Sequence, residues 1–244
     1  MRVDYQVQAL YEVAIKKVVS DEEQWKSVCR MMGRLYRYEF DNILMIYMQR
    51  PNATLVADYD TWKDRRVRRY VKQGSKGIAI FPSKALKPYI RYVFDISDTN
   101  GRNTRLTWKL EEQEKELYAQ YLSRKTNIQK ETTENFLKEL IKQKIESIME
   151  SEFSDRVEAI EHLITANMEI HKITKQEALK RSILYTVFTR CGFEIPSEMQ
   201  DFSFIKALRS EKEIYRFGTL VSDISCEILK TIARELSIVA SVVA

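Results

Sequence analysis

The hydrophobic pattern changes its period twice along this chain, and this change constrains the fold more than any other feature. Between Trp25 and Leu35 the apolar residues recur every three to four positions, as on one face of an α-helix. Three short β-prone runs follow at residues 53–57, 77–81 and 89–94. Beyond Trp108 the helical spacing returns. The sequence therefore predicts an α+β fold, with N-terminal helices and a small antiparallel sheet followed by an α-helical C-terminal part.

Local signals predict several helix ends. Ser20–Glu23 has the pattern of a capping box and begins the first predicted helix. A second predicted helix covers Glu39–Gln49, because Pro51 forces its end. Thr174–Glu177 is another capping box, and it begins a helix that Gly192 can close in the left-handed conformation.

The strand region carries its own turn signals. Arg68–Lys72 could form a further strand that leads into a turn at Gly74–Gly77, and Asp98–Gly101 supplies a turn after the third β-prone run. The sequence has only six glycines and four prolines, and this low content argues against long flexible linkers and against an all-β architecture. We therefore expect a basic α+β domain at residues 1–110 and a helical domain at residues 111–244.

Charge is segregated along the chain. The window Thr61–Arg91 holds ten Lys or Arg residues against a single acid, Asp64. Residues 1–110 carry 21 basic and 12 acidic side chains, a net charge of +9, whereas residues 111–244 carry 19 and 23, a net charge of −4. Such segregation is typical of a surface that binds a polyanion. A solvated face without a ligand is the alternative interpretation of a basic run.

Aromatic residues lie among these charges. Flat rings stack on unpaired bases while cations contact phosphates, so the combination suits a single strand better than a duplex. Several of the rings could equally belong to the core, and for three of them we expect this: Trp62, Phe81 and Phe94. The remaining tyrosines are Tyr70 and Tyr89 in the window and Tyr92 directly after it.

Signals for catalysis are sparse. His162 and His171 are the only histidines, and nine helical residues would place them on opposite faces. The sequence has no HExxH, CxxC, Walker A, GxSxG or GxGxxG motif, so we expect no metal site, no cofactor and no enzymatic activity. Three widely spaced cysteines and no membrane-spanning run lead us to expect a cytoplasmic protein without membrane contact.

An ordered set of motifs over residues 20–100 resembles a known family. The motifs are GRLYRYEFDN at residues 33–42, LMIY at 44–47, QRPNAT at 49–54, VKQGSKGIAI at 71–80 and YVFDISDT at 92–99. Together they are similar to the N-terminal single-stranded-DNA-binding domain of ArdC-like antirestriction proteins of mobile elements. The resemblance implies that residues 36–42 and 72–77 belong to the DNA-facing or structural signature of that domain. The zinc metalloprotease-like domain of that family has no counterpart here, because its HExxH motif is missing.

Our first hypothesis is a non-enzymatic single-stranded-DNA-binding protein of a mobile genetic element or phage, serving DNA transfer or protection from host defence. The stacking candidates are Tyr36 and Tyr38, and Asn42 is a candidate polar contact. The candidate cations that complete the site are Arg37, Arg65, Arg66, Arg68, Arg69, Lys72 and Lys76.

The rival hypothesis is an anti-CRISPR or antirestriction inhibitor that binds a host defence nuclease directly. Its basis is the net charge of −4 on residues 111–244, because clustered carboxylates can compete with DNA for a basic groove. A third interpretation treats the helical part as a scaffold or as the interface of a homodimer.

Overall fold

The structure is a computed structural model, and it describes residues 2–81, 90–101, 106–126, 132–164 and 173–243. Its helices are α1 (Arg2–Lys17), α2 (Glu22–Arg34), α3 (Phe40–Gln49), α4 (Tyr59–Lys63), α5 (Glu112–Thr126), α6 (Thr133–Glu150), α7 (Ser154–Leu163), α8 (Lys175–Cys191) and α9 (Glu211–Val243). Its strands are β1 (Val56–Ala57), β2 (Arg69–Val71), β3 (Ile78–Ile80), β4 (Arg91–Asp95) and β5 (Thr99–Gly101).

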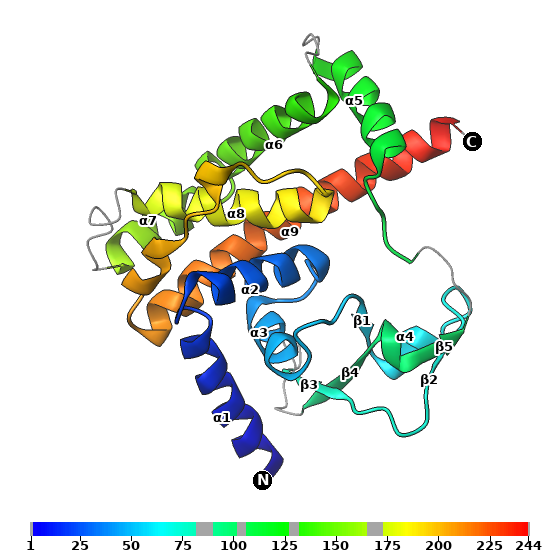
Figure 1. Cartoon of the computed structure of the whole chain (residues 1–244), viewed down its shortest axis with the longest axis vertical. Coiled ribbons are helices and arrows are strands. Elements are labelled where there is room, and N and C mark those ends of the chain that lie inside the picture. The colour runs from blue at the N-terminus through cyan, green and yellow to red at the C-terminus, as the bar shows by residue number, and fades with distance from the viewer. Residues whose placement is uncertain (1, 82–89, 102–105, 127–131, 165–172, 244) are drawn as a thin grey trace.

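The strands form two small antiparallel units, ordered β1-β4-β3 and β2-β5. Figure 1 shows them at one end of the molecule, beside α4, while α5–α9 form the helical part. The predicted α+β class is therefore confirmed.

The helices share one hydrophobic core. In Figure 1, α9 runs through the helical part with α8 and α2 close to it, and α2 packs on α8 and α3 on α9. The fully buried rings of Trp25 and Phe217 lie 5.7 Å apart, although 192 residues separate them in sequence. Helices from both expected domains thus contribute to one core, and the division at residue 110 stays a prediction.

Two glycines allow these helices to approach closely. A Cβ atom on Gly33 of α2 would lie 2.7 Å from the Thr186 carbonyl oxygen of α8. A Cβ atom on Gly218 of α9 would lie 2.1 Å from Cζ of Phe40, the first residue of α3. Real Cβ atoms do not come this close to other atoms, so both positions require glycine for packing.

Two amide side chains of α3 pair with the outer edge of β3. Phe81 N donates to Asn42 Oδ1 at 2.8 Å, and Asn42 Nδ2 donates to Phe81 O at 3.3 Å. Gln49 makes the same pair of bonds with Ala79, at 2.9 and 2.8 Å. The two amides replace a neighbouring strand and satisfy backbone groups that would otherwise be open for pairing.

Several local predictions are confirmed and two are wrong. Thr174 caps α8 by accepting from Glu177 N, and Gly192 closes it at φ 67°. The N-cap of α2 is Asp21, which accepts from Gln24 N, so the capping box predicted from Ser20 is wrong. The predicted turn at Asp98–Gly101 is largely strand β5, because residues 99–101 pair with β2.

Asp95 anchors the segment that enters β1. Its buried carboxylate accepts from Thr54 N at 2.8 Å, Leu55 N at 3.1 Å and Ser97 N at 3.0 Å. Burial by itself would raise the pKa of Asp95, but these backbone hydrogen bonds favour the charged form and hold the pKa below its usual value. The stability that they contribute is present above the unfolded-state pKa of about 3.9 and is lost as pH falls through the lower folded-state value.

We therefore expect Asp95→Asn to lower the free energy of unfolding by about 1–3 kcal/mol at pH 7, since an amide cannot accept three N–H bonds with a full charge. The difference in free energy of unfolding between Asp95→Asn and the parent protein should become smaller below about pH 4. Urea unfolding at several pH values measures this, and exposed Asp60→Asn is the matched control. An equal loss at pH 3 and pH 7 would show that the charge of Asp95 does not contribute.

Candidate nucleic-acid interface

The arginine loop, residues 64–68, connects α4 to β2 and presents three exposed cations. Asp64 organises it: its Oδ1 accepts from Arg66 N at 2.8 Å, and its carbonyl oxygen accepts from Arg68 N at 2.8 Å. These bonds fix the backbone in a tight turn and leave the side chains of Arg65, Arg66 and Arg68 in solvent. Within the described residues none of the three forms an ion pair, so their charge is available to a polyanion.

Arg68 has an unusual backbone. Its φ of 52° lies in the left-handed region, which costs an L-residue other than glycine about 1 kcal/mol or more. Its Nε donates to the Arg65 carbonyl oxygen at 2.9 Å, which keeps the guanidinium over the loop. A strained arginine at an exposed turn, where glycine would be more stable, suggests that its side chain has a function.

We expect Arg68→Gly to raise the free energy of unfolding by up to about 1 kcal/mol, because glycine relieves the strain. The same change should weaken binding to single-stranded DNA about 3- to 10-fold through loss of one phosphate contact. Arg66→Gly is the matched control: its backbone is not left-handed, so it should destabilise while weakening binding similarly. Urea unfolding and fluorescence anisotropy measure the two effects, and unchanged binding by Arg68→Gly would exclude its role.

Arg69 differs from its neighbours. It is 7% exposed, and its Nε donates to Thr99 Oγ1 at 2.7 Å while Nη2 donates to Thr99 O at 3.2 Å. The side chain therefore holds β2 against β5. Arg69 was predicted to contact phosphate, but the structure places it beneath the loop, in a structural position.

The turn at residues 72–77 carries two more of the predicted cations, Lys72 and Lys76, both exposed. Ser75 N donates to Lys72 O at 3.1 Å, and Gly74 takes φ 82°, a value that glycine adopts without strain. Lys72 Nζ donates to Ser97 O at 2.8 Å, so this ammonium is partly used within the protein. Lys84, Lys87 and Tyr89 lie outside the described residues.

The predicted residues between α2 and α3 occupy different environments. Tyr36 is 8% exposed, and its hydroxyl accepts from Trp108 Nε1 at 3.2 Å. Tyr38 is half-buried and donates to Val56 O at 2.9 Å, while burial and the Asp58 carboxylate raise its pKa to about 12. Arg37 is exposed. Neither tyrosine is thus an open surface platform, and Asn42 is committed to strand β3.

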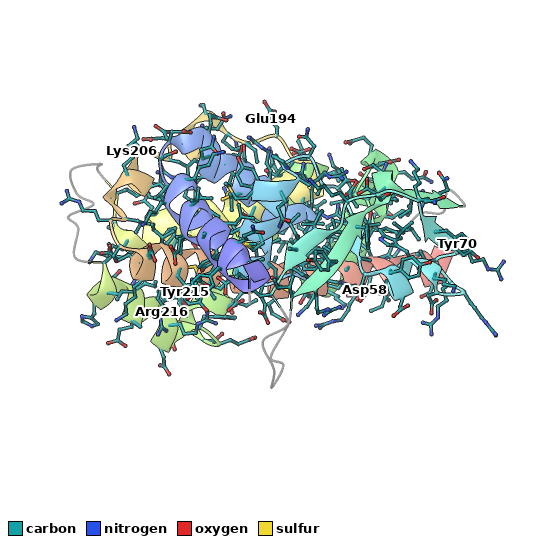
Figure 2. The ribbon with its side chains drawn as sticks, turned by 90° about the horizontal axis from the view of Figure 1, so that it is seen from below. Asp58, Tyr70, Glu194, Lys206, Tyr215 and Arg216 are labelled. Atoms are coloured by element: carbon teal, nitrogen blue, oxygen red, sulfur yellow. The ribbon has the colours of Figure 1, made fainter. Side chains whose placement is uncertain are left out.

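Exposed rings lie instead on the strands. Tyr70 of β2 is 56% exposed and Tyr92 of β4 is 50% exposed, whereas Trp62 is buried and donates from Nε1 to Phe94 O, as its predicted core role requires. Figure 2 shows Tyr70 at the sheet end of the molecule, far from Tyr215 and Arg216. Side-chain alternation in the sequence does not identify Tyr70, because it would place charged Arg69 outside and Tyr70 inside, the reverse of what the structure shows.

The arginine–aromatic pocket lies next to the arginine loop, with Val67 in its wall and a volume of about 540 Å³. It joins segments that are distant in sequence: residues 34–38, 55–58, 61–62 and 106–108, together with Arg190 of α8. The Arg190 guanidinium lies 3.8 Å from the centre of the Trp108 ring. Three of the predicted residues, Tyr36, Arg37 and Tyr38, thus meet in this pocket.

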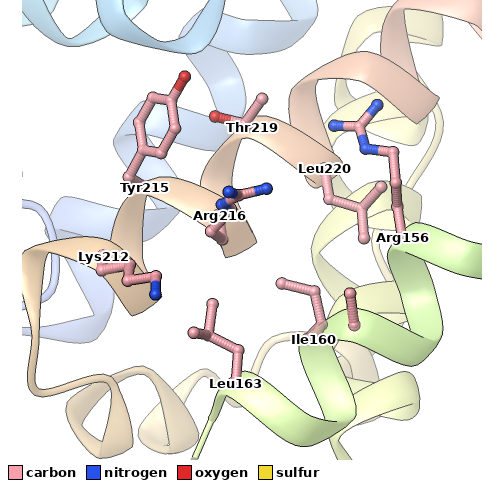
Figure 3. A pocket seen from close by; sticks show the side chains of 9 residues that line it. Arg156, Ile160, Leu163, Lys212, Tyr215, Arg216, Thr219 and Leu220 are labelled. Atoms are coloured by element: carbon pink, nitrogen blue, oxygen red, sulfur yellow. The ribbon is translucent and has the colours of Figure 1, made fainter.

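In the described part of the chain, two other hollows lie among helices α6–α9. One, of about 550 Å³, is enclosed by α7 and α9 (Figure 3). Its Arg156 pairs with Asp223 at 2.7 Å, and Ile160, Leu163 and Leu220 make much of its wall apolar. The other, of about 670 Å³, is lined by five glutamates of α6, α7 and α8, by His162 and by Lys180, which pairs with Glu146. Neither contains a residue of the predicted DNA contacts.

Comparisons of the chain with models of known protein families, with curated proteins and with solved structures found no match. In the part of the chain that the structure describes, no His, Cys, Asp and Glu cluster could hold a metal ion. No helix among the described residues is long and apolar enough to cross a membrane. Fold and surface therefore define the class of protein: it is an α+β protein with exposed arginines beside an aromatic pocket.

Proposed function

We propose that this protein binds single-stranded DNA through the arginine loop and the strands beside it. The observation that carries the proposal is the exposure of three guanidiniums on one constrained turn, none of which forms an ion pair within the described residues. The turn lies in residues 1–110, which have a net charge of +9. Guanidiniums bind phosphate bidentately, and the exposed rings of Tyr70 and Tyr92 can stack on unpaired bases. A duplex hides its base faces, so the rings favour a single strand.

The strain at Arg68 supports the same proposal. Selection for stability alone would place glycine or asparagine at a left-handed turn position. The resemblance of residues 20–100 to ArdC-like domains agrees with single-stranded DNA as the ligand. A role in DNA transfer, or in protecting incoming DNA from host defence, follows from that resemblance and is proposed with it.

Fluorescence anisotropy with a labelled 20-nucleotide strand tests the proposal. With about five phosphates neutralised, log K against log salt should have a slope of about −3.5. Unlabelled single strand should compete at least about 10-fold better than duplex of the same sequence. A flat salt response, or equal competition by duplex, would contradict the proposal.

A second candidate is inhibition of a host defence nuclease by direct protein contact. It is favoured by the glutamate-lined hollow among α6, α7 and α8, whose carboxylates are Glu146, Glu150, Glu158, Glu161 and Glu177. Such a surface could mimic the phosphates that a nuclease binds. A pull-down with candidate nucleases in the absence of nucleic acid should then recover a stoichiometric complex, and replacing the glutamates by glutamine should abolish it.

A further inference from the structure

Two arginines of the arginine–aromatic pocket form no ion pair with the residues that the structure describes. Arg34 and Arg190 line it, and the Nε atoms of both are buried without a hydrogen-bond partner. Arg34 Nη2 donates to Pro51 O at 3.3 Å and Arg190 Nη2 donates to Trp108 O at 2.6 Å, so each uses a neutral carbonyl acceptor. Both arginines are partly buried, which disfavours their charge, and the charge of Asp95 offsets only part of this effect at Arg34.

No carboxylate of the described residues pairs with either guanidinium. Asp58 lines the same pocket, but its carboxylate is engaged by Arg91 Nη2 at 2.8 Å and by Thr61 N at 2.8 Å. Burial lowers the pKa of both Arg34 and Arg190, an effect that an incoming anion would offset. The pocket is therefore suited to a negatively charged group.

The packing of α2 on α8 places the backbone next to Arg34 against Arg190. Gly33 precedes Arg34, and a Cβ atom there would lie 3.2 Å from Cβ of Arg190. This contact brings together residues that are 156 positions apart in sequence. Both arginines line one pocket from helices that pack on each other, so their backbone positions are fixed before any anion binds.

Much of the rest of the wall is aromatic. Tyr36, Tyr38, Trp62 and Trp108 contribute to it, and the Trp108 ring carries the Arg190 guanidinium on its face. Rings and guanidinium planes are the surfaces on which nucleic-acid bases stack. A volume of about 540 Å³ is within the range of pockets that enclose small organic ligands.

We infer that this pocket binds one nucleotide unit, with its phosphate on Arg34 and Arg190 and its base against the aromatic wall. The inference rests on the proposed function, because Val67 places the pocket beside the arginine loop that would contact the neighbouring phosphates. Exposed Arg37 stands 5.8 Å from the Tyr36 ring and lines the same pocket, where it can contact the adjoining phosphate.

Titration of the full chain with thymidine monophosphate, followed by tryptophan fluorescence, tests the inference. The nucleotide should bind at least about 10-fold more tightly than thymidine or inorganic phosphate, since only the nucleotide satisfies both parts of the site. Arg34→Gln and Arg190→Gln should each weaken this binding about 10-fold. Arg124→Gln, on the exposed surface of α5, should not change it. Trp108→Phe should remove most of the fluorescence response.

The outcomes separate this inference from the proposed function. Binding of the oligonucleotide without binding of the mononucleotide, and with full affinity in Arg34→Gln, would overturn the pocket and leave the proposed function standing. Equal affinity for phosphotyrosine would overturn the assignment to a nucleotide. Failure of both oligonucleotide and mononucleotide to bind would overturn the two together. Because Arg190 also holds the Trp108 carbonyl, Arg190→Lys provides a variant that keeps a charge and a donor there.

Discussion

Replacing Arg65, Arg66 and Arg68 together by glutamate is expected to lower the affinity for single-stranded DNA at least about 100-fold at 0.1 M salt. Each arginine is exposed and, in the proposed complex, makes one phosphate contact, so three favourable contacts would become three repulsions. The slope of log K against log salt should become less negative by about 2, at about 0.7 per phosphate. Anisotropy titrations over a salt series measure both quantities.

A matched control variant changes the net charge by the same amount as the triple variant, but at positions away from the arginine loop. Arg124, Lys206 and Arg209 are exposed, and their joint replacement by glutamate alters the net charge by the same amount. Figure 2 shows Lys206 at the end of the molecule opposite Tyr70. This control should weaken binding less than about 5-fold, through the long-range field only. Similar losses in both triple variants would show that binding depends on net charge and not on the arginine loop.

Gly218→Ala is expected to destabilise the fold by about 3 kcal/mol, although alanine within a helix normally stabilises by about 1 kcal/mol. The new methyl group would lie 2.1–2.5 Å from three ring atoms of buried Phe40. Helices α3 and α9 cannot move apart from each other without opening the core around Trp25 and Phe217. Urea unfolding measures the loss.

The double variant Gly218→Ala/Phe40→Leu separates this contact from a general effect on helix α9. A smaller residue at position 40 leaves space for the methyl group, so the two changes should be non-additive by about 1–2 kcal/mol. Ser241→Ala, at an exposed position of the same helix, should have an effect within about 0.5 kcal/mol. Strict additivity of the two core changes would contradict the packing of α3 against α9.

Local chemistry made part of the fold predictable. Thr174 and Gly192 act on neighbours a few residues away, and Pro51 follows directly on the end of α3, so their roles follow from short-range sequence. Strand β5 and the cap at Asp21 were missed for different reasons. A three-residue strand such as Thr99–Gly101 forms only because β2 pairs with it. The N-cap was missed because Ser20 and Asp21 are both suitable capping residues, and the sequence does not show which of them caps α2.

The candidate site was only partly predictable from sequence. The exposed arginines follow from composition, but burial of Arg69 depends on Thr99 across the β2–β5 ladder. The arginine–aromatic pocket could not be predicted, because Arg34 and Arg190 meet only through packing of α2 on α8. The exposure of Tyr70 could not be predicted either, because it follows from the burial of its neighbour Arg69.

The central claim is that the surface formed by the arginine loop and the exposed strand tyrosines binds a single strand. Photo-crosslinking tests it most directly, with a bromodeoxyuridine-substituted oligonucleotide and mapping of the modified peptides by mass spectrometry. If this surface binds the strand, crosslinks are expected on Tyr70 and Tyr92, and these crosslinks should be lost in the Arg65/Arg66/Arg68 triple variant. Crosslinks confined to the helices around Tyr215, at the far end of the molecule, would contradict it.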